Sequence, residues 1–245
     1  MAQLREYKSS VFSMLLEDPK NCLQVYNALN NTSHEDPSLV EIKRLDGGIL
    51  LSIRNDASFL IDNHLNLFEH QSTYNPNMPL RSLIYFTGLV REHITNDDLF
   101  KRQKITIPVP HFVVFYNGVE KRPEKETMLL SSSYAHDVNE PDLELKCTAY
   151  NIGNGNNRKL LEKCPVLSEY MIFVDKVRKF MDEYNDIETA IDIAIKECIA
   201  EHVLEDFLSE KGNEVKQVAA LDYTFERREK LFRAEEREEG IKEGI

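Results

Sequence analysis

Residues 54–72 have the sequence RNDASFLIDNHLNLFEHQS, and this sequence predicts a β-hairpin. Residues 57–61 are apolar and strand-forming, and the cluster Asp62-Asn63-His64 is typical of a turn. Residues 65–68 then resume the strand pattern. We therefore expect two antiparallel strands joined by this turn, with the rest of the fold arranged around them.

The alternation of side chains along the second strand determines which of them meet. One face carries Leu65, Leu67, Glu69 and Gln71, and the other carries Asn66, Phe68, His70 and Ser72. Pairing around the turn brings Asp56 close to Glu69 and Gln71, so two acids and an amide converge. Hard oxygen ligands of this kind suit Mg²⁺ or Mn²⁺. The alternative is that both acids are ordinary solvated charges at strand ends.

Several stretches on both sides of the hairpin form an ordered set. They are residues 8–12, 55–59, 68–73 and 110–118 and the glutamate- and glycine-rich tail. The pattern of Asp56, twelve residues and Glu69-x-Gln71 resembles the PD-(D/E)XK nuclease motif. The whole set resembles, more narrowly, the Rpn family of recombination-promoting nucleases, also described as transposases. The resemblance covers most of the chain in order.

This resemblance implies an α/β fold of the restriction-endonuclease-like type. Residues 1–165 would form the PD-(D/E)XK core, with a mixed central sheet flanked by helices. Residues 166–245 would form a C-terminal helical subdomain and a charged tail. The implied function is a metal-dependent DNA endonuclease with little sequence specificity, associated with recombination, mobile DNA or phage defence.

The resemblance also assigns roles to individual residues. Asp56 and Glu69 would hold Mg²⁺, or Mn²⁺, together with the backbone carbonyl of His70. Gln71 would be the third catalytic residue, although many relatives of the superfamily carry lysine there, and glutamine neither carries charge nor titrates. Arg81 and Tyr85 lie four apart on a predicted helix and so point the same way. They would contact the substrate phosphate, and the alternative is that Arg81 pairs with Asp56 or Glu69 for structure alone.

Two differences from the family pattern, Gln71 and the segment described next, together with the net charge, leave other functions possible. The family often has an acid in the segment where this chain has Lys8-Ser9-Ser10, so no catalytic role is assigned there. The net charge of −12 is unfavourable for an enzyme that must bind phosphates. A catalytically degenerate member that acts as an interaction or regulatory protein is therefore one alternative. A non-catalytic nucleic-acid binder or mimic is another.

The acidic excess is not spread evenly. Residues 41–104, which surround the hairpin, carry eight basic and eight acidic side chains, and most of the excess acid follows residue 104. DNA binding near the hairpin is thus compatible with the total charge.

Composition also bears on the compartment. No apolar run approaches the ~20 residues that span a bilayer, and no secretory signal pattern opens the chain. Cys22, Cys147, Cys164 and Cys198 are widely spaced, which argues against a zinc ribbon or a redox motif. We expect a soluble cytoplasmic protein with reduced thiols and no membrane contact.

The remaining elements follow from hydrophobic periodicity. Before the hairpin, residues 7–30 are predicted to be helical with a break at Asp18-Pro19, and residues 39–44 and 48–53 to be strands. After it we expect a helix from Pro79 to about residue 94, strands at 111–116 and 143–152, and a turn at 153–157.

The C-terminal part is predicted to be helical from Glu169 onward. A second helix should start near Asp186 and stop at Gly212. Residues 214–239 then read as a charged amphipathic helix. Its apolar positions could form a seam for homo-oligomerisation, and the alternative is a solvated helix face.

Overall fold

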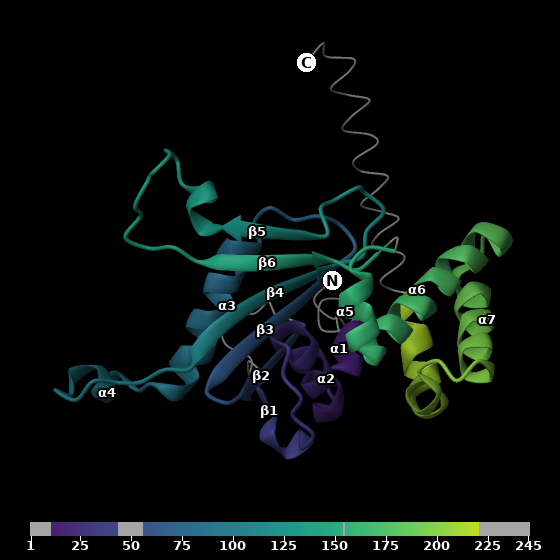
Figure 1. The fold of residues 1–245 in the computed structure, drawn as a ribbon, viewed down its shortest axis with the longest axis horizontal. Coiled ribbons are helices and arrows are strands. Elements are labelled where there is room, and N and C mark those ends of the chain that lie inside the picture. Colours follow the sequence, from purple (N-terminus) through teal and green to yellow (C-terminus); the bar gives the residue numbers. More distant parts are fainter. Residues whose placement is uncertain (1–10, 44–55, 154, 221–245) are drawn as a thin grey trace, which may run out of the picture. The chain divides into compact units, whose positions relative to one another are not determined.

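The fold is that of a computed structural model, which describes residues 11–43, 56–153 and 155–220. These residues form two compact units, one of residues 12–168 and one that contains Val11 and the chain from Glu169 onward. The predicted α/β class, with a mixed sheet flanked by helices, is confirmed (Figure 1). The predicted strand at 48–53, most of the charged helix at 214–239 and the segment Lys8-Ser9-Ser10 lie outside the described residues.

The first unit is built on a six-stranded sheet in the order β1-β2-β3-β4-β6-β5. Its strands are β1 (Glu41–Lys43), β2 (Ala57–Ile61), β3 (His64–Gln71), β4 (Val109–Tyr116), β5 (Lys125–Leu129) and β6 (Lys146–Asn151). The three central strands β3, β4 and β6 are parallel, whereas β1, β2 and β5 pair antiparallel at the two sides. The predicted hairpin therefore supplies one of the central strands.

The hairpin has the predicted pairing. Ala57 lies opposite Phe68 and Ile61 lies opposite His64. Asp62 and Asn63 form the two-residue turn, with φ of 50° and 60°. Both values are left-handed, as a type I′ turn requires, and aspartate and asparagine tolerate this region better than most residues. The turn is one residue shorter than expected, because His64 already belongs to β3.

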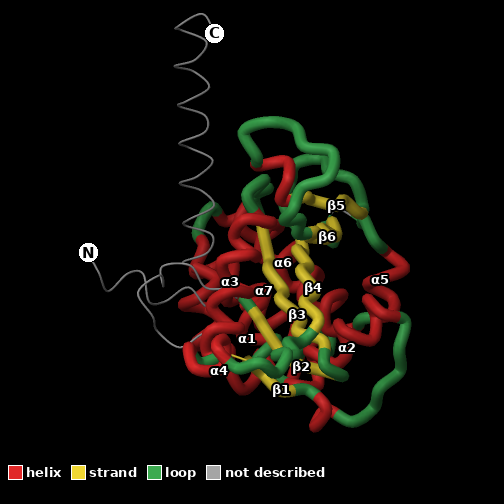
Figure 2. The backbone as a smooth tube through the Cα atoms, turned by 90° about the vertical axis from the view of Figure 1, so that its left-hand side faces the viewer, coloured by secondary structure: helices red, strands yellow, loops and turns green. Residues whose placement is uncertain are grey.

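One face of the sheet packs on helix α3 (Met78–His93), which starts with Pro79 in its first turn as predicted. Figure 2 shows α3 on one side of the strands and α2 on the other. The core on the α3 side is continuous and joins residues from α3 and from β3, β4, β5 and β6. Its buried members include Leu65, Leu67, Met78, Tyr85, Leu89, Phe112, Val114, Met128, Cys147 and Ala149.

The opposite face packs on α1 (Val11–Leu15) and α2 (Pro19–Asn30). The break between these helices falls where Asp18-Pro19 predicts it, and the Asp18 carboxylate accepts from the Lys20 amide at 2.8 Å. Aromatic rings form this core: Phe12, Phe59, Phe68 and Phe115 are all almost fully buried. Phe68 and Phe115 meet edge to face at 5.5 Å. The predicted alternation of faces along β3 is thus confirmed.

The carboxyl ends of β3 and β4 continue into closely packed turns. A Cβ at Gly118 would collide with the backbone oxygen of Ser72 and with the Tyr116 ring. Glycine is required there because the segment after β4 passes directly against the segment after β3. These contacts fix the end of β3 that carries Glu69 and Gln71.

Three elements were not expected from the sequence. They are β5, α4 (Asn96–Phe100) and α5 (Arg158–Lys163). Thr95 and Asp98 form a capping box that starts α4 within the polar residues that follow the predicted helix at 79–94. Residues 143–152 were predicted to be a strand, but β6 begins only at Lys146. Short 3₁₀ helices lie at Pro37–Leu39 and Leu130–Ser133.

The second unit contains α6 (Pro165–Tyr184) from Glu169 onward, α7 (Ile187–Ala200) and a helical stretch at 205–220. Asp186 caps α7 as predicted, with its carboxylate accepting from the Thr189 amide. The predicted stop at Gly212 is wrong, because Gly212 lies within the stretch 205–220. The helix ends earlier, at residues 201–204, where His202 and Leu204 have φ of 60° and 49°. A helix cannot continue through left-handed residues.

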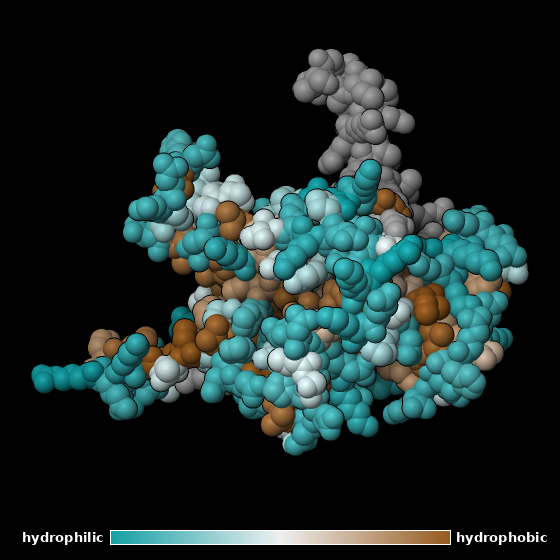
Figure 3. Space-filling view, viewed as in Figure 1, coloured by the Kyte–Doolittle hydropathy of each residue, from teal (hydrophilic) through white to brown (hydrophobic). Residues whose placement is uncertain are grey.

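Apolar side chains are exposed on the segment around α4. Figure 1 shows α4 at the end of an extension from the sheet, and Figure 3 shows apolar side chains along it. Leu99 is 66% exposed and Phe100 is 88% exposed.

Among the described helices, none combines the length and the apolar composition needed to cross a membrane. All four cysteines are buried and free of disulfides.

Candidate metal and phosphate site

Asp56 lies immediately before β2 and next to the end of β3. Its Oδ2 atom accepts from the His70 backbone N–H at 2.6 Å, and its Oδ1 atom accepts from the Ser13 hydroxyl at 3.1 Å. These contacts anchor the carboxylate beside Glu69, because Ala57 pairs with Phe68 and Asp56 precedes Ala57. The structure therefore brings the two acids together, as the hairpin register predicts.

Glu69 is the most deeply buried acid of this cluster, with only 6% of its side chain exposed. It points from β3 toward α3. Its Oε2 atom accepts from Arg81 Nη2 at 3.2 Å. Its Oε1 atom is buried and has no hydrogen-bond partner among the described residues. An unsatisfied buried carboxylate oxygen is costly and calls for an explanation, such as a cation or a water.

Arg81 and Tyr85 come together on one side of α3, as their spacing predicts. The Arg81 Nε and Nη2 atoms donate to the Tyr85 hydroxyl at 3.0 and 2.7 Å. The same guanidinium pairs with Glu69 and keeps 31% of its side chain exposed. Arg81 thus neutralises part of the buried acid and still reaches solvent. Both the structural role and the phosphate-binding role remain compatible with this position.

Burial has the largest effect on the pKa values of Glu69 and Tyr85 in this cluster. Loss of hydration raises the pKa of Glu69 well above its usual value, and the charge of Asp56 raises it further. Arg81, the Asp56 backbone N–H and the Tyr85 hydroxyl act in the opposite direction. Burial also raises the pKa of Tyr85, so this residue stays a neutral phenol. A raised pKa at a carboxylate beside a second acid is typical of functional sites.

Gln71 lies on the same face of β3 as Glu69, but its amide is turned toward α3. Gln71 is buried, and its Nε2 atom donates to the Met78 sulfur at 2.6 Å. This contact holds the side chain in a fixed position at the end of the strand. In this conformation the amide packs in the protein core on the α3 side.

His70 has its side chain on the opposite face, where its ring stacks on Phe12 at 5.3 Å. Its backbone faces the acids. In a strand the N–H and C=O of one residue point in the same lateral direction. Because the His70 N–H donates to Asp56, its carbonyl also faces the side on which Asp56 lies. The predicted third ligand is therefore oriented toward the first.

Three residues near the acids were not identified from the sequence as parts of the site. Ser13 donates to Asp56 from α1. Ser82 and Cys147 lie on the α3 side of the sheet, where the Cys147 thiol donates to the Ser82 hydroxyl at 3.2 Å. Burial raises the pKa of Cys147 to about 11, and Glu69 adds to the rise. The only sequence signal for Ser13 is its position as a polar residue within an apolar helical run.

These residues fit a divalent cation of the Mg²⁺ type. Mg²⁺ typically uses one or two protein carboxylates and keeps several waters. Asp56 and Glu69 supply two carboxylates, and the unpartnered Oε1 atom of Glu69 is a ready ligand. Within the described residues, no three histidine, cysteine, aspartate or glutamate side chains gather as a metal site. A site of two carboxylates and a carbonyl therefore suits Mg²⁺ or Mn²⁺ better than zinc.

Comparisons with known proteins do not assign this chain to a family. No protein-family model matches the chain, and searches of curated proteins and of solved structures found no match either. The resemblance to the Rpn nucleases thus rests on the residues of the sequence.

Proposed function

We propose that this protein is a metal-dependent DNA endonuclease with a restriction-endonuclease-like PD-(D/E)XK core. The observation that carries the proposal is the buried Glu69 carboxylate, which has an unpartnered oxygen and stands beside Asp56 at the end of a central strand. The proposal includes a cytoplasmic location, self-association through the C-terminal helices and a role in DNA recombination or phage defence.

Each residue of the cluster has a definite task in this reaction. Asp56, Glu69 and the His70 carbonyl would hold Mg²⁺ or Mn²⁺, which would supply an activated water and neutralise charge on the scissile phosphate. Ser13 and the His70 N–H orient Asp56. Arg81 keeps Glu69 partly compensated and, with its exposed part, binds a phosphate oxygen. Tyr85 fixes the guanidinium through two hydrogen bonds.

Cleavage of supercoiled plasmid tests this function directly. Wild type should nick or linearise the plasmid with Mg²⁺ and with Mn²⁺, and should not do so in EDTA. The Asp56→Ala/Glu69→Ala double variant should leave the plasmid intact under all three conditions. Equal cleavage by the double variant would show that a contaminant cuts. Absence of cleavage by wild type under every condition would reject the endonuclease.

Gln71→Lys is a sharper test of the third position. Lysine can stabilise negative charge on the phosphate, which glutamine cannot do, so we expect cleavage to be retained or raised. The substitution removes the hydrogen bond from the Gln71 amide to the Met78 sulfur. Initial rates of plasmid nicking at equal folded concentration provide the measurement. Complete loss of cleavage in a folded variant would show that Gln71 serves the core instead.

One observation favours a second function, that of a catalytically degenerate interaction protein. Both oxygens of Asp56 already accept hydrogen bonds from Ser13 and His70, and the Gln71 amide contacts Met78. A cluster that is largely satisfied internally can be purely structural. Isothermal titration with Mg²⁺ and Mn²⁺ separates the two functions, because only the nuclease requires a cation at Glu69.

A further inference from the structure

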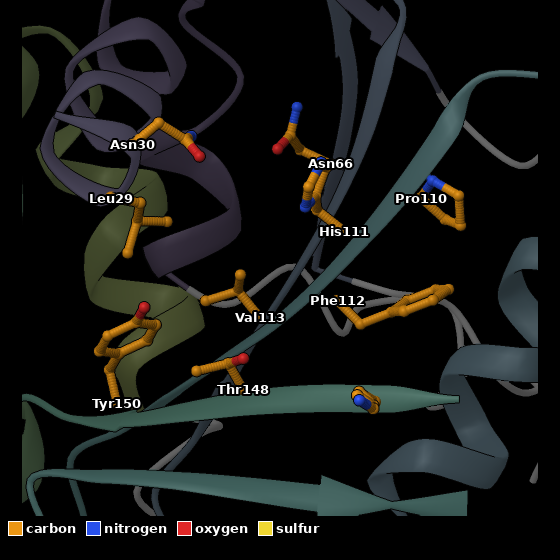
Figure 4. A pocket seen from close by; sticks show the side chains of 10 residues that line it. Leu29, Asn30, Asn66, Pro110, His111, Phe112, Val113, Thr148 and Tyr150 are labelled. Carbon is orange, nitrogen blue, oxygen red and sulfur yellow. The ribbon is translucent and has the colours of Figure 1, made fainter. Parts of the chain in front are cut away.

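A second polar site lies on the face of the sheet opposite to Glu69. It is a pocket of about 320 Å³ between α2 and the strands β3, β4 and β6. Polar and charged side chains line it: Asn30, Asn66, His111, Lys146, Thr148 and Tyr150. Figure 4 shows Asn30 and Asn66 extending toward each other from α2 and β3, with Thr148 and Tyr150 below them. Its size is at the lower end of small-molecule sites.

The sheet register explains why these residues share one face. Asn66 lies beside His111 in the pairing of β3 with β4. Thr148 lies beside Val113, and Tyr150 beside Phe115, in the pairing of β4 with β6. All are therefore on the α2 side. Glu69 lies three positions after Asn66 on β3, so its side chain is on the opposite face and points to α3. The pocket and the acidic site are thus separate.

Several polar atoms around the pocket lack protein partners. Asn66 is only 2% exposed, and its nitrogen donates to the His64 carbonyl at 3.3 Å. The Asn30 nitrogen donates to the Tyr26 carbonyl at 2.9 Å. Both amides are thereby oriented. Their oxygens, like the hydroxyls of Thr148 and Tyr150, make no hydrogen bond with any other described residue. These oxygens can accept from a ligand or a water, and the lining atom that is buried without a hydrogen-bond partner among the described residues is His111 Nε2.

Charge and shape narrow the class of ligand. Lys146 is the one lining side chain with a fixed charge, and it is positive. Burial and the neighbouring His64 lower the pKa of His111, so its imidazole is neutral at pH 7. The rings of His111 and Tyr150 provide flat walls, whereas the Phe112 ring lies in the core on the α3 side of the sheet. The matching ligand is planar, offers N–H donors to two amide oxygens and carries a negative group.

We propose that this pocket binds a nucleoside monophosphate. The amino and ring N–H groups of the base would donate to Asn66 and Asn30, and the phosphate would pair with Lys146. The hydroxyls of Thr148 and Tyr150 would bind the remaining polar edge of the base or the sugar. This site goes beyond the proposed nuclease function and does not depend on it.

Binding is tested with the four common ribonucleoside 5′-monophosphates by isothermal titration and ligand-observed NMR on the full chain. At least one should bind. Thr148→Val and Tyr150→Phe each remove one hydroxyl without changing shape, and each should weaken binding by about fivefold. Lys146→Met should weaken the nucleotide and leave the corresponding nucleoside unchanged. Thr127→Val is the matched control, because Thr127 pairs with Thr148 across β5 and β6 but does not line the pocket.

Three results would overturn the proposal. They are failure of all four nucleotides to bind at millimolar concentration, equal affinity in wild type and in both hydroxyl variants, and displacement of the nucleotide by inorganic phosphate alone. Glu69→Gln separates this proposal from the nuclease. Unchanged nucleotide affinity in that variant supports the pocket even if the protein cuts no DNA, whereas lost affinity would place the nucleotide at the acidic site and overturn the proposal.

Discussion

Glu69→Gln should lower the rate of metal-dependent plasmid cleavage by about 100-fold or more. Loss of a residue that only orients a metal ligand typically costs 10–100-fold, so loss of a charged ligand should cost at least as much. The amide has nearly the same shape and can still accept from Arg81 at the position of Oε2. Nicking rates across a range of Mg²⁺ and Mn²⁺ concentrations measure the effect.

The chain offers a matched control for this variant in Glu126→Gln. Glu126 also pairs with an arginine, since Arg122 Nη2 lies 2.7 Å from its Oε2 atom, but it is partly exposed and lies on β5. This substitution should leave the cleavage rate within about twofold of wild type, as expected for an exposed ion pair away from the reacting groups. If Glu69→Gln cuts as fast as Glu126→Gln, Glu69 holds no catalytic cation.

The hairpin and its acids could be predicted because local information is sufficient for them. Leu65 and Leu67 on either side of Asn66 indicate the faces of β3, and Asp62-Asn63 specifies a left-handed turn. Once the turn is fixed, the register places Asp56 beside Glu69 without any long-range information. The four-residue spacing of Arg81 and Tyr85 has the same local character.

Other parts could not be predicted because they depend on partners far away in the sequence. The strand β5 has the sequence Lys125-Glu126-Thr127-Met128-Leu129, and its two charged residues are as typical of a loop as of a strand. It forms a strand because it pairs with β6. Ser13 reaches Asp56 across 43 positions. The end of α7 at residues 201–204 carries no glycine, so Gly212 was the stronger local stop signal.

Arg81→Met should destabilise the protein by about 3 kcal/mol near neutral pH, because it leaves the buried Glu69 without its compensating charge. In the Glu69→Gln background the same substitution should cost only about 1 kcal/mol, since a neutral amide replaces the acid. Urea unfolding in EDTA of wild type, Arg81→Met, Glu69→Gln and the double variant measures both changes in the free energy of unfolding. Lys101→Met, which removes an exposed pair with Asp98, should cost less than about 1 kcal/mol.

The cost of Arg81→Met should also depend on pH. Burial holds the pKa of Glu69 in the folded protein above its unfolded value, so stability falls as the pH rises through this range. Arg81 favours the charged carboxylate and limits that rise in pKa. Without it the folded pKa is higher still, and the fall in stability continues to higher pH. The difference between variant and wild type should therefore be smallest below the wild-type pKa of Glu69 and should grow as the pH is raised. A difference that is constant with pH, or that persists in full in the Glu69→Gln background, would show that Arg81 stabilises the fold by packing and through Tyr85 rather than by compensating the acid.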